Sequence, residues 1–233
     1  MESITYGTQA IDFHLARAER KTLGIEVHPD LSVWAIAPVD SQLEDVKLKL
    51  EKRSAWIVKQ KKYFEQFLPR TPEREYVAGE THNYLGKRYL LNVKSTTTDS
   101  VKLKAGVLMV TSKGKISSQK TRALLTEWYY EHAKKRFEKE FKQALLQFQF
   151  REISEPRLVI RRMKNRWGSC TPSGKIIINP ELIKAPSKCI EYVFIHEFCH
   201  LVHPNHGKEF YSLLESILPE WERWKITLEK FMC

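Results

Sequence analysis

The chain has 233 residues, of which 42% are hydrophobic and 29% charged, as in an ordinary globular protein. No apolar run reaches the roughly 18 residues that a membrane-spanning helix needs, so we expect no membrane partner. Lys and Arg outnumber Asp and Glu by 39 to 28, and the net charge of +11 favours nucleic acid, a nucleotide or an acidic polypeptide as partner, unless the lysines only solvate helix faces.

Two further features favour the cytoplasm. The N-terminus lacks the basic segment and apolar core of a secretory signal. Cys189 and Cys199 fall on one predicted helix, about 15 Å apart at helical rise, whereas a disulfide needs Cα atoms within about 7 Å. Reduced thiols are therefore expected, as in a cytosolic protein.

Apolar and polar residues alternate over residues 11–15, 23–27 and 33–37, which predicts an antiparallel meander with a turn at residues 28–30. Ser41 and Glu44 have the spacing of a capping box. Apolar residues then recur at helical spacing up to Pro69, which predicts one long basic helix.

Alternation returns between Thr81 and Val110, with a turn at Ala105-Gly106, and predicts further strands. Residues 117–148 contain no Pro or Gly, which predicts a second long helix. Its predicted inner face consists of Leu124, Trp128, Phe137, Phe141 and Leu145.

The last third of the chain carries denser signals. Residues 158–163 and 175–179 are predicted as two strands joined by a loop, and the second strand is either an interior strand or an edge for an extended peptide. Three helices follow, at residues 186–203, 206–218 and 220–231, separated by prolines. The expected class is α+β, with a strand-rich N-terminal region at 1–116 and a helical region at 117–233 on a small antiparallel sheet.

Residues 196–200 read His-Glu-Phe-Cys-His. On a helix, residues four apart share a face, so His196 and His200 reach one metal ion while Glu197 is placed to activate a metal-bound water. From Tyr192 to Val202 all residues except His196, Glu197 and His200 are apolar, which predicts a helix buried nearly all round. A buried polar group without a partner costs about 1–3 kcal/mol, so a metal is favoured over histidines hydrogen-bonded within a core.

A hydrolytic zinc site usually has three protein ligands. His206 follows His196 by ten residues, the spacing of the third ligand in HExxHxxGxxH enzymes, and is the predicted ligand. His203 stands where those enzymes have glycine and Pro204 breaks the helix instead, so a metzincin is disfavoured. The alternatives for the third ligand are His203, otherwise expected to support a ligand or face the substrate, and then Glu209 or Glu215.

Three segments closely resemble the YgjP-like metal-dependent hydrolases: RMKNRWGSC (162–170), KIIINPELIKAP (175–186) and YVFIHEFCHLVHPNHGKEF (192–210). The resemblance extends over nearly the whole chain, including Trp56-Ile57 and the YLGKRY segment at 84–89. That family is grouped with minigluzincin and SprT-like zinc peptidases. The resemblance implies a zincin-like C-terminal region, a chain that forms one family-length unit, one Zn²⁺ held by His196, His200 and His206, Glu197 as general base, and a polypeptide substrate.

Two other functions stay open. Between Pro156 and Pro180 there are basic residues and no acidic one, so Arg166 and its neighbours favour a nucleotide or phosphoester hydrolase as the alternative; Trp167 is expected to pack rather than stack on a base. A third interpretation makes Cys170 a fourth ligand of a structural zinc in a nucleic-acid-binding module. Glu197 argues against it, because a closed site needs no base.

Overall fold

The computed structural model describes residues 2–28, 30–66, 68, 74–149, 151, 153, 155–164 and 166–232. The chain divides into two compact units, Met1–Thr71 with Cys233 and Pro72–Met232, and each is described by itself. Among the described residues, no helix has the length and apolar character needed to cross a membrane.

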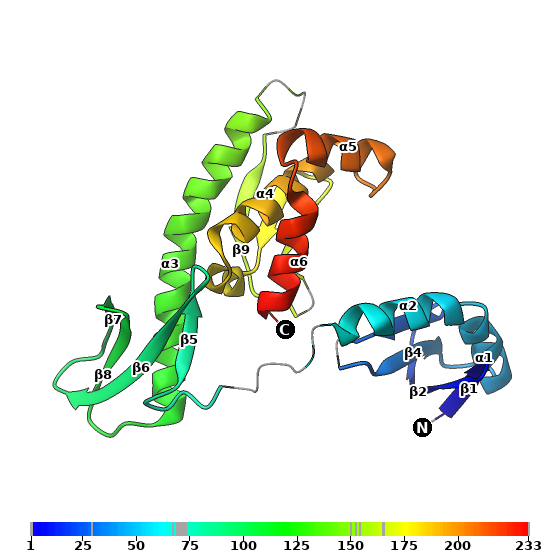
Figure 1. Cartoon of the computed structure of the whole chain (residues 1–233), viewed down its shortest axis with the longest axis horizontal. Helices are drawn as coiled ribbons and strands as arrows, with labels where there is room; N and C mark the ends of the chain where they lie inside the picture. The colour runs from blue at the N-terminus through cyan, green and yellow to red at the C-terminus, as the bar shows by residue number, and fades with distance from the viewer. Residues whose placement is uncertain are drawn as a thin grey trace. The chain divides into compact units, whose positions relative to one another are not determined.

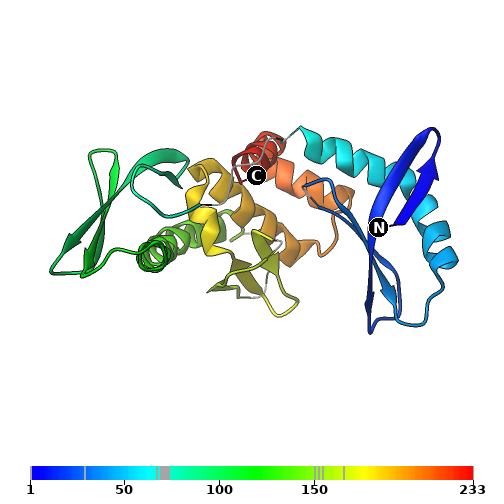
Figure 2. The same ribbon diagram turned by 90° about the horizontal axis from the view of Figure 1, so that it is seen from below.

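The first unit is a four-stranded sheet with helices on one face (Figure 1, Figure 2). Its elements are β1 (Glu2–Tyr6), β2 (Gln9–Ala18), β3 (Gly24–Val27), β4 (Val33–Pro38), α1 (Leu43–Glu51) and α2 (Ser54–Glu65). Alternate residues of the strands, such as Phe13 and Ala35, are fully buried with Leu50 and Ile57 of the helices. The alternation in the sequence thus marks the face that the helices cover.

The prediction of an antiparallel meander was wrong. The strand order is β1-β2-β4-β3, and β2 pairs with β4 in parallel. Strand β1 was not predicted, and Pro29 of the predicted turn lies outside the described residues. Alternation gives the face of each strand but not its partner, because pairing order depends on contacts between distant residues.

The predicted capping box and the single helix were also wrong. Gln42 is the N-cap residue of α1 and makes no side-chain cap. The Ser41 hydroxyl instead donates to the Pro38 carbonyl at 2.8 Å and accepts from Arg17 at 2.9 Å. The helix stops at Glu51, whose carbonyl accepts from the Ser54 hydroxyl at 2.7 Å, and α2 begins there; Pro69 lies outside the described residues.

The second unit starts with another four-stranded sheet, formed by β5 (Thr81–Tyr84), β6 (Lys87–Thr96), β7 (Ser100–Lys104) and β8 (Val107–Lys113). Its order is β5-β6-β8-β7, with β6 and β8 parallel, which repeats the topology of the first unit. The predicted turn is confirmed, because Ala105 and Gly106 both have positive φ, 49° and 78°, as a two-residue hairpin turn requires.

The predicted long helix is confirmed as α3 (Ser118–Gln147), and the Ser117 side chain caps it by accepting from Lys120 N–H at 3.2 Å. Its buried stripe is shifted from the predicted one: Leu145 is 37% exposed, whereas Leu124, Trp128 and Phe141 flank the stripe. The buried residues are Thr121, Leu125, Tyr129, Ala133, Phe137, Glu140 and Ala144. Both stripes have helical spacing, and packing partners decide between them.

A three-stranded sheet and a group of helices complete the unit: β9 (Arg157–Ile160), β10 (Gly168–Cys170), β11 (Lys175–Ile178), the 3₁₀-helix η1 (Pro180–Lys184), α4 (Ser187–Val202), α5 (Lys208–Ile217) and α6 (Trp221–Met232). The three predicted helices are confirmed. The sheet is mixed rather than antiparallel, because β11 pairs with β9 in parallel and with β10 antiparallel. Strand β10 forms inside the predicted loop, and β11 is an interior strand rather than an edge.

The α+β class is confirmed, with strands and helices both prominent. The predicted boundary between 116 and 117 falls within the second unit, where Leu108 and Val110 of β8 share one core with Leu125 of α3 and Phe194 of α4. The predicted strand-rich region thus combined two sheets that belong to different units, because composition alone does not show which strands pack together. Cys170, Cys189 and Cys199 form no disulfide, as expected.

Removing the Phe137 ring from α3 should destabilise the second unit. Phe137 is fully buried and its ring centroid lies 5.7 Å from that of Phe194, so Phe137→Ala is expected to lower the free energy of unfolding by about 3–5 kcal/mol. Denaturant unfolding measures the loss. Tyr130→Ala, at a residue 39% exposed on the same helix, is the control. Equal losses in the two variants would contradict this packing of α3 against α4.

Candidate active site

Helix α4 bears the candidate site. It lies in the second unit between α3 and α6 and contacts both (Figure 1). It begins after Pro186, whose carbonyl accepts from the N–H groups of Cys189 and Ile190. Most of its residues are buried, as the sequence predicts. The helix ends at Val202, two residues before Pro204, which cannot donate a helical hydrogen bond.

The structure brings together the three predicted metal ligands. One ring nitrogen from each of His196, His200 and His206 lies within 4.8 Å of the other two, and the Nε2 atoms of His196 and His206 are 3.1 Å apart. Phe210 of α5 packs against all three imidazoles, with ring centroids 4.6 to 5.0 Å away. The break at Pro204 therefore returns the chain to the open face of α4.

His203 is not part of this group. Its Nδ1 lies 3.7 Å from Glu209, while its backbone carbonyl accepts from His200 Nδ1 at 3.2 Å. That hydrogen bond fixes the ring of His200 and leaves Nε2 free as a ligand. The contribution of His203 thus comes from its main chain, which a sequence motif does not reveal.

The three imidazoles suit a metal ion electrostatically. Burial, together with the nearby His200 and His206, lowers the pKa of His196 to about 3, and burial also lowers the pKa of His206. Both rings are therefore neutral near pH 7 and present lone pairs. His196 Nδ1 is buried and has no hydrogen-bond partner among the described residues. Three histidine ligands form a donor set that fits zinc.

Glu197 is 6% exposed and lies against strand β10. A Cβ atom placed on Gly168 would lie 2.5 Å from Glu197 Oε1, so only glycine fits there. Burial raises the pKa of Glu197 to about 7, although the Arg166 guanidinium and the Cys170 backbone N–H favour the ionised form. The carboxyl group is thus poised between its two protonation states near neutral pH.

Asn179 fixes the loop that carries Arg166 and Trp167. Its side-chain amide, 3% exposed, donates to the carbonyls of Met163 at 2.8 Å and Arg166 at 3.1 Å, and its backbone N–H donates to the Trp167 carbonyl. Trp167 packs against the core, as expected, and Arg166 is exposed. Gly168, Asn179 and Phe210 lie within the three segments that resemble the YgjP-like hydrolases, but no pattern in the sequence assigned them a role. A glycine within a strand is the one signal that indicates such a close approach.

Cys170 lies beside the site without joining the metal group. The three histidines form that group among the described residues, and Cys170 Sγ donates to the Thr171 carbonyl at 3.6 Å. Burial, with the nearby Glu197 carboxylate, raises the pKa of Cys170 to about 11. The thiol is therefore protonated near neutral pH and is a poor ligand in this state.

Two cavities lie at the site, and both are lined by Arg166, Gly168, His196 and Glu197. One of 590 Å³ extends past His200 and His206 along the residues that follow β10. The other, of 220 Å³, extends toward α6. Glu197 and His196 thus line both cavities.

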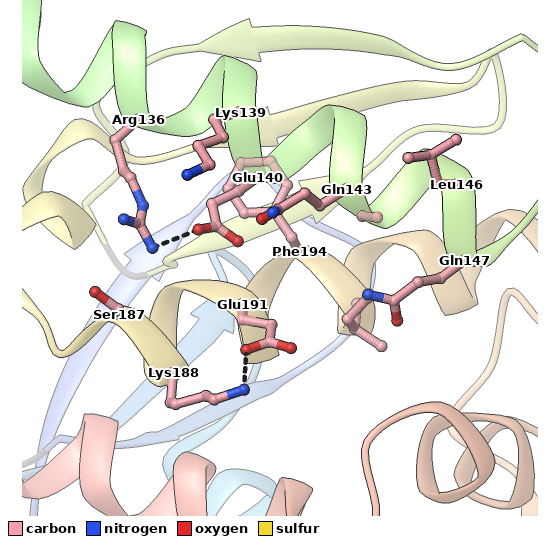
Figure 3. A pocket seen from close by; sticks show the side chains of 12 residues that line it. Arg136, Lys139, Glu140, Gln143, Leu146, Gln147, Ser187, Lys188, Glu191 and Phe194 are labelled. Atoms are coloured by element: carbon pink, nitrogen blue, oxygen red, sulfur yellow. Dashed lines mark hydrogen bonds and ion pairs between the residues drawn. The ribbon is translucent and has the colours of Figure 1, made fainter.

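A separate cavity of 530 Å³ lies between α3 and α4, away from the histidines (Figure 3). Four of its charged side chains are paired: Arg136 contacts Glu140 at 2.5 Å, and Lys188 contacts Glu191 at 2.7 Å. Both carboxylates of this cavity therefore already have cationic partners, and Lys139 is its remaining charged side chain.

Replacing Gly168 by alanine should displace Glu197, because the new methyl group would overlap the carboxylate. Gly168→Ala is expected to destabilise the second unit by about 1–3 kcal/mol, measured by thermal unfolding, and to reduce any activity of the site. Gly207→Ala is the matched control, since nothing lies within 4 Å of a Cβ atom at Gly207. A Gly168→Ala protein as stable and active as the control would contradict this contact.

Comparison with known proteins shows a family and several similar solved structures. No curated protein matches the chain. The crystal structures of the metallopeptidase zymogens abylysin, from Pyrococcus abyssi, and jannalysin, from Methanocaldococcus jannaschii, are similar over 38% of this chain and 84% and 88% of theirs, with 23% and 17% identity and a TM-score of 0.34 each. The YgjP-like metallopeptidase domain matches residues 21–231, and the chain therefore belongs to the YgjP-like metallopeptidase family.

Proposed function

We propose that the chain is a zinc peptidase that hydrolyses polypeptides, with His196, His200 and His206 as metal ligands and Glu197 as general base. The observation that carries the proposal is the convergence of three imidazole nitrogens within 4.8 Å beside a buried glutamate. Membership of a metallopeptidase family supports a metal ion and a polypeptide substrate.

The residues around the histidines suit them to hold zinc. His200 is oriented by the His203 carbonyl, and Phe210 restricts all three rings. Burial keeps His196 neutral. When bound, zinc supplies a Lewis acid that polarises a carbonyl group and makes water more acidic.

Glu197 performs the proton transfers in this proposal. With a pKa of about 7, its carboxylate accepts a proton from the attacking water, and the resulting acid donates that proton to the departing amine. Arg166 and the Cys170 N–H favour the carboxylate that starts the cycle. Gly168 lets the carboxyl group lie directly on the wall of the cavity, which limits its motion.

Hydrolysis of nucleotides or other phosphoesters is the second candidate. It is favoured by the exposed guanidinium of Arg166, which lines both cavities at the site. Part of the positive charge in this region is already engaged, because Arg162 pairs with Glu181 at 2.7 Å. We therefore prefer the peptidase, and the product of the reaction discriminates between the two.

Metal content tests the ligand assignment. The purified protein is expected to hold about one zinc ion, and His206→Ala to lose it, whereas His203→Ala should retain it because its backbone carbonyl is unchanged. Elemental analysis and competition with a chelator measure the affinity, with a loss of at least about tenfold expected for His206→Ala. Normal zinc affinity in His206→Ala would reject His206 as a ligand.

Substitution of Glu197 tests the mechanism. Glu197→Gln is expected to leave folding and zinc content nearly intact and to reduce turnover by at least about 100-fold, because the amide cannot accept the proton. Wild type is assayed on unstructured polypeptides, by mass spectrometry of the products, and separately on nucleoside triphosphates, by phosphate release. Turnover that persists in Glu197→Gln would refute the mechanism, and Glu197-dependent phosphate release without proteolysis would favour the second candidate.

A further inference from the structure

More than half of the net positive charge of the chain lies in the sheet formed by β5–β8. Residues 81–116, which contain the four strands, have seven basic residues and one acidic residue, whereas the net charge of the whole chain is +11. The acidic residue, Asp99, is paired with Lys120 of α3 at 2.9 Å. None of the seven basic residues forms an ion pair among the described residues. Their charge is therefore not neutralised within the second unit.

The register of the strands places four of these cations on one face of the sheet. Leu91 and Leu108 are buried in the same core as Leu125 of α3, so the residues that alternate with them point away from that helix. Four exposed basic residues occupy such positions: Arg88 and Lys94 of β6, and Lys102 and Lys104 of β7. We call this surface the basic face. The Ser100 and Thr111 hydroxyls of the same face lie 2.9 Å apart, in agreement with the register.

The basic face also lacks opposing charge. None of its strands β5, β6, β7 and β8 contains an acidic residue. Leu90 lies between Arg88 and Lys94 at alternate positions of β6 and is 47% exposed. A sheet face with several cations and no anion attracts a ligand that carries repeated negative charge.

A cavity of 790 Å³ adjoins the basic face at strand β7. Lys102 and Lys104 line it together with three aromatic side chains, Tyr84, Trp128 and His132, and no acidic residue lines it among the described residues. The centroid of the Trp128 ring lies 4.9 Å from that of Tyr84 and 4.0 Å from that of His132. Aromatic side chains beside cations suit a nucleic acid, because each base has a flat face and each phosphate has a charge.

We propose that the basic face binds single-stranded nucleic acid, with phosphates on its four cations and one unpaired base in the aromatic cavity. The surface is separate from the candidate active site, since neither its cations nor the three rings line the cavities at His196 and Glu197. A duplex offers phosphates but keeps its bases stacked inside the helix. An acidic polypeptide or an anionic membrane offers charge without bases.

Salt dependence is the first test. Fluorescence anisotropy measures the Kd of the full chain for a labelled oligothymidylate. With four phosphate contacts, binding is expected to weaken about 50-fold between about 50 and 200 mM salt, because each contact releases counterions. The double variant Lys102→Ala, Lys104→Ala should bind more weakly, and its loss over the same range should be only about 7-fold. The control Lys59→Ala, Lys62→Ala removes the same charge from exposed positions of α2 and should keep the wild-type salt dependence.

Photo-crosslinking tests the position of the base. An oligonucleotide that contains 5-bromouracil is irradiated with the wild-type protein, and mass spectrometry of the crosslinked peptides is expected to identify Tyr84, Trp128 or His132. In a second measurement, Trp128→Leu keeps an apolar side chain but removes the aromatic surface, and should raise the Kd about fivefold or more. Thermal unfolding of this variant checks that it is folded.

Each outcome bears directly on the proposal. Equal salt dependence in the two double variants, crosslinks confined to other segments, or equal affinity for the oligothymidylate and a DNA duplex would overturn it. Binding to polyglutamate or to vesicles of anionic lipid, without binding to the oligonucleotide, would also overturn it. None of these measurements requires turnover, so they are independent of the proposed peptidase function.

Discussion

The second unit depends on the burial of α4, a helix that is apolar on nearly every side and yet carries His196, Glu197 and His200. Four elements of this unit contact it: α3, β10, α5 and α6. Burial gives the three polar side chains fixed positions and a low-dielectric surrounding, which lowers the pKa of His196 and raises that of Glu197. One packing requirement thus shapes both the fold and the chemistry of the site.

Contacts with the backbone fix the positions of the side chains in the site. Gly168 allows β10 to touch the carboxyl group of Glu197, and Asn179 ties the preceding loop to the end of β11 through two carbonyl groups. The main chain of His203 orients His200 in the same way. These contacts involve backbone atoms, which hold catalytic groups more rigidly than flexible side chains do.

Two buried carboxyl groups in the second unit show how neighbouring charges decide the role of a glutamate. Glu140 is paired with Arg136 within one helix and lines the cavity between α3 and α4. Glu197 has partial compensation from Arg166 and a backbone N–H, which suits a group that must exchange a proton. Proteins retain such unfavourable groups at functional sites.

The sequence by itself determined the local elements and the centre of the site. The spacing of apolar residues and the positions of Pro and Gly predicted α3 to within a residue at each end, the three C-terminal helices and the Ala105-Gly106 turn. These features depend mainly on neighbouring residues. The HExxH spacing and the return after Pro204 predicted that His196, His200 and His206 converge. Only the tertiary structure decided the parallel pairing of β2 with β4 and of β9 with β11, the assignment of β5–β8 to the second unit, and the contacts of Gly168 and Asn179. Each of these depends on which distant segments pack together, and alternation or composition along the chain carries no information about that choice.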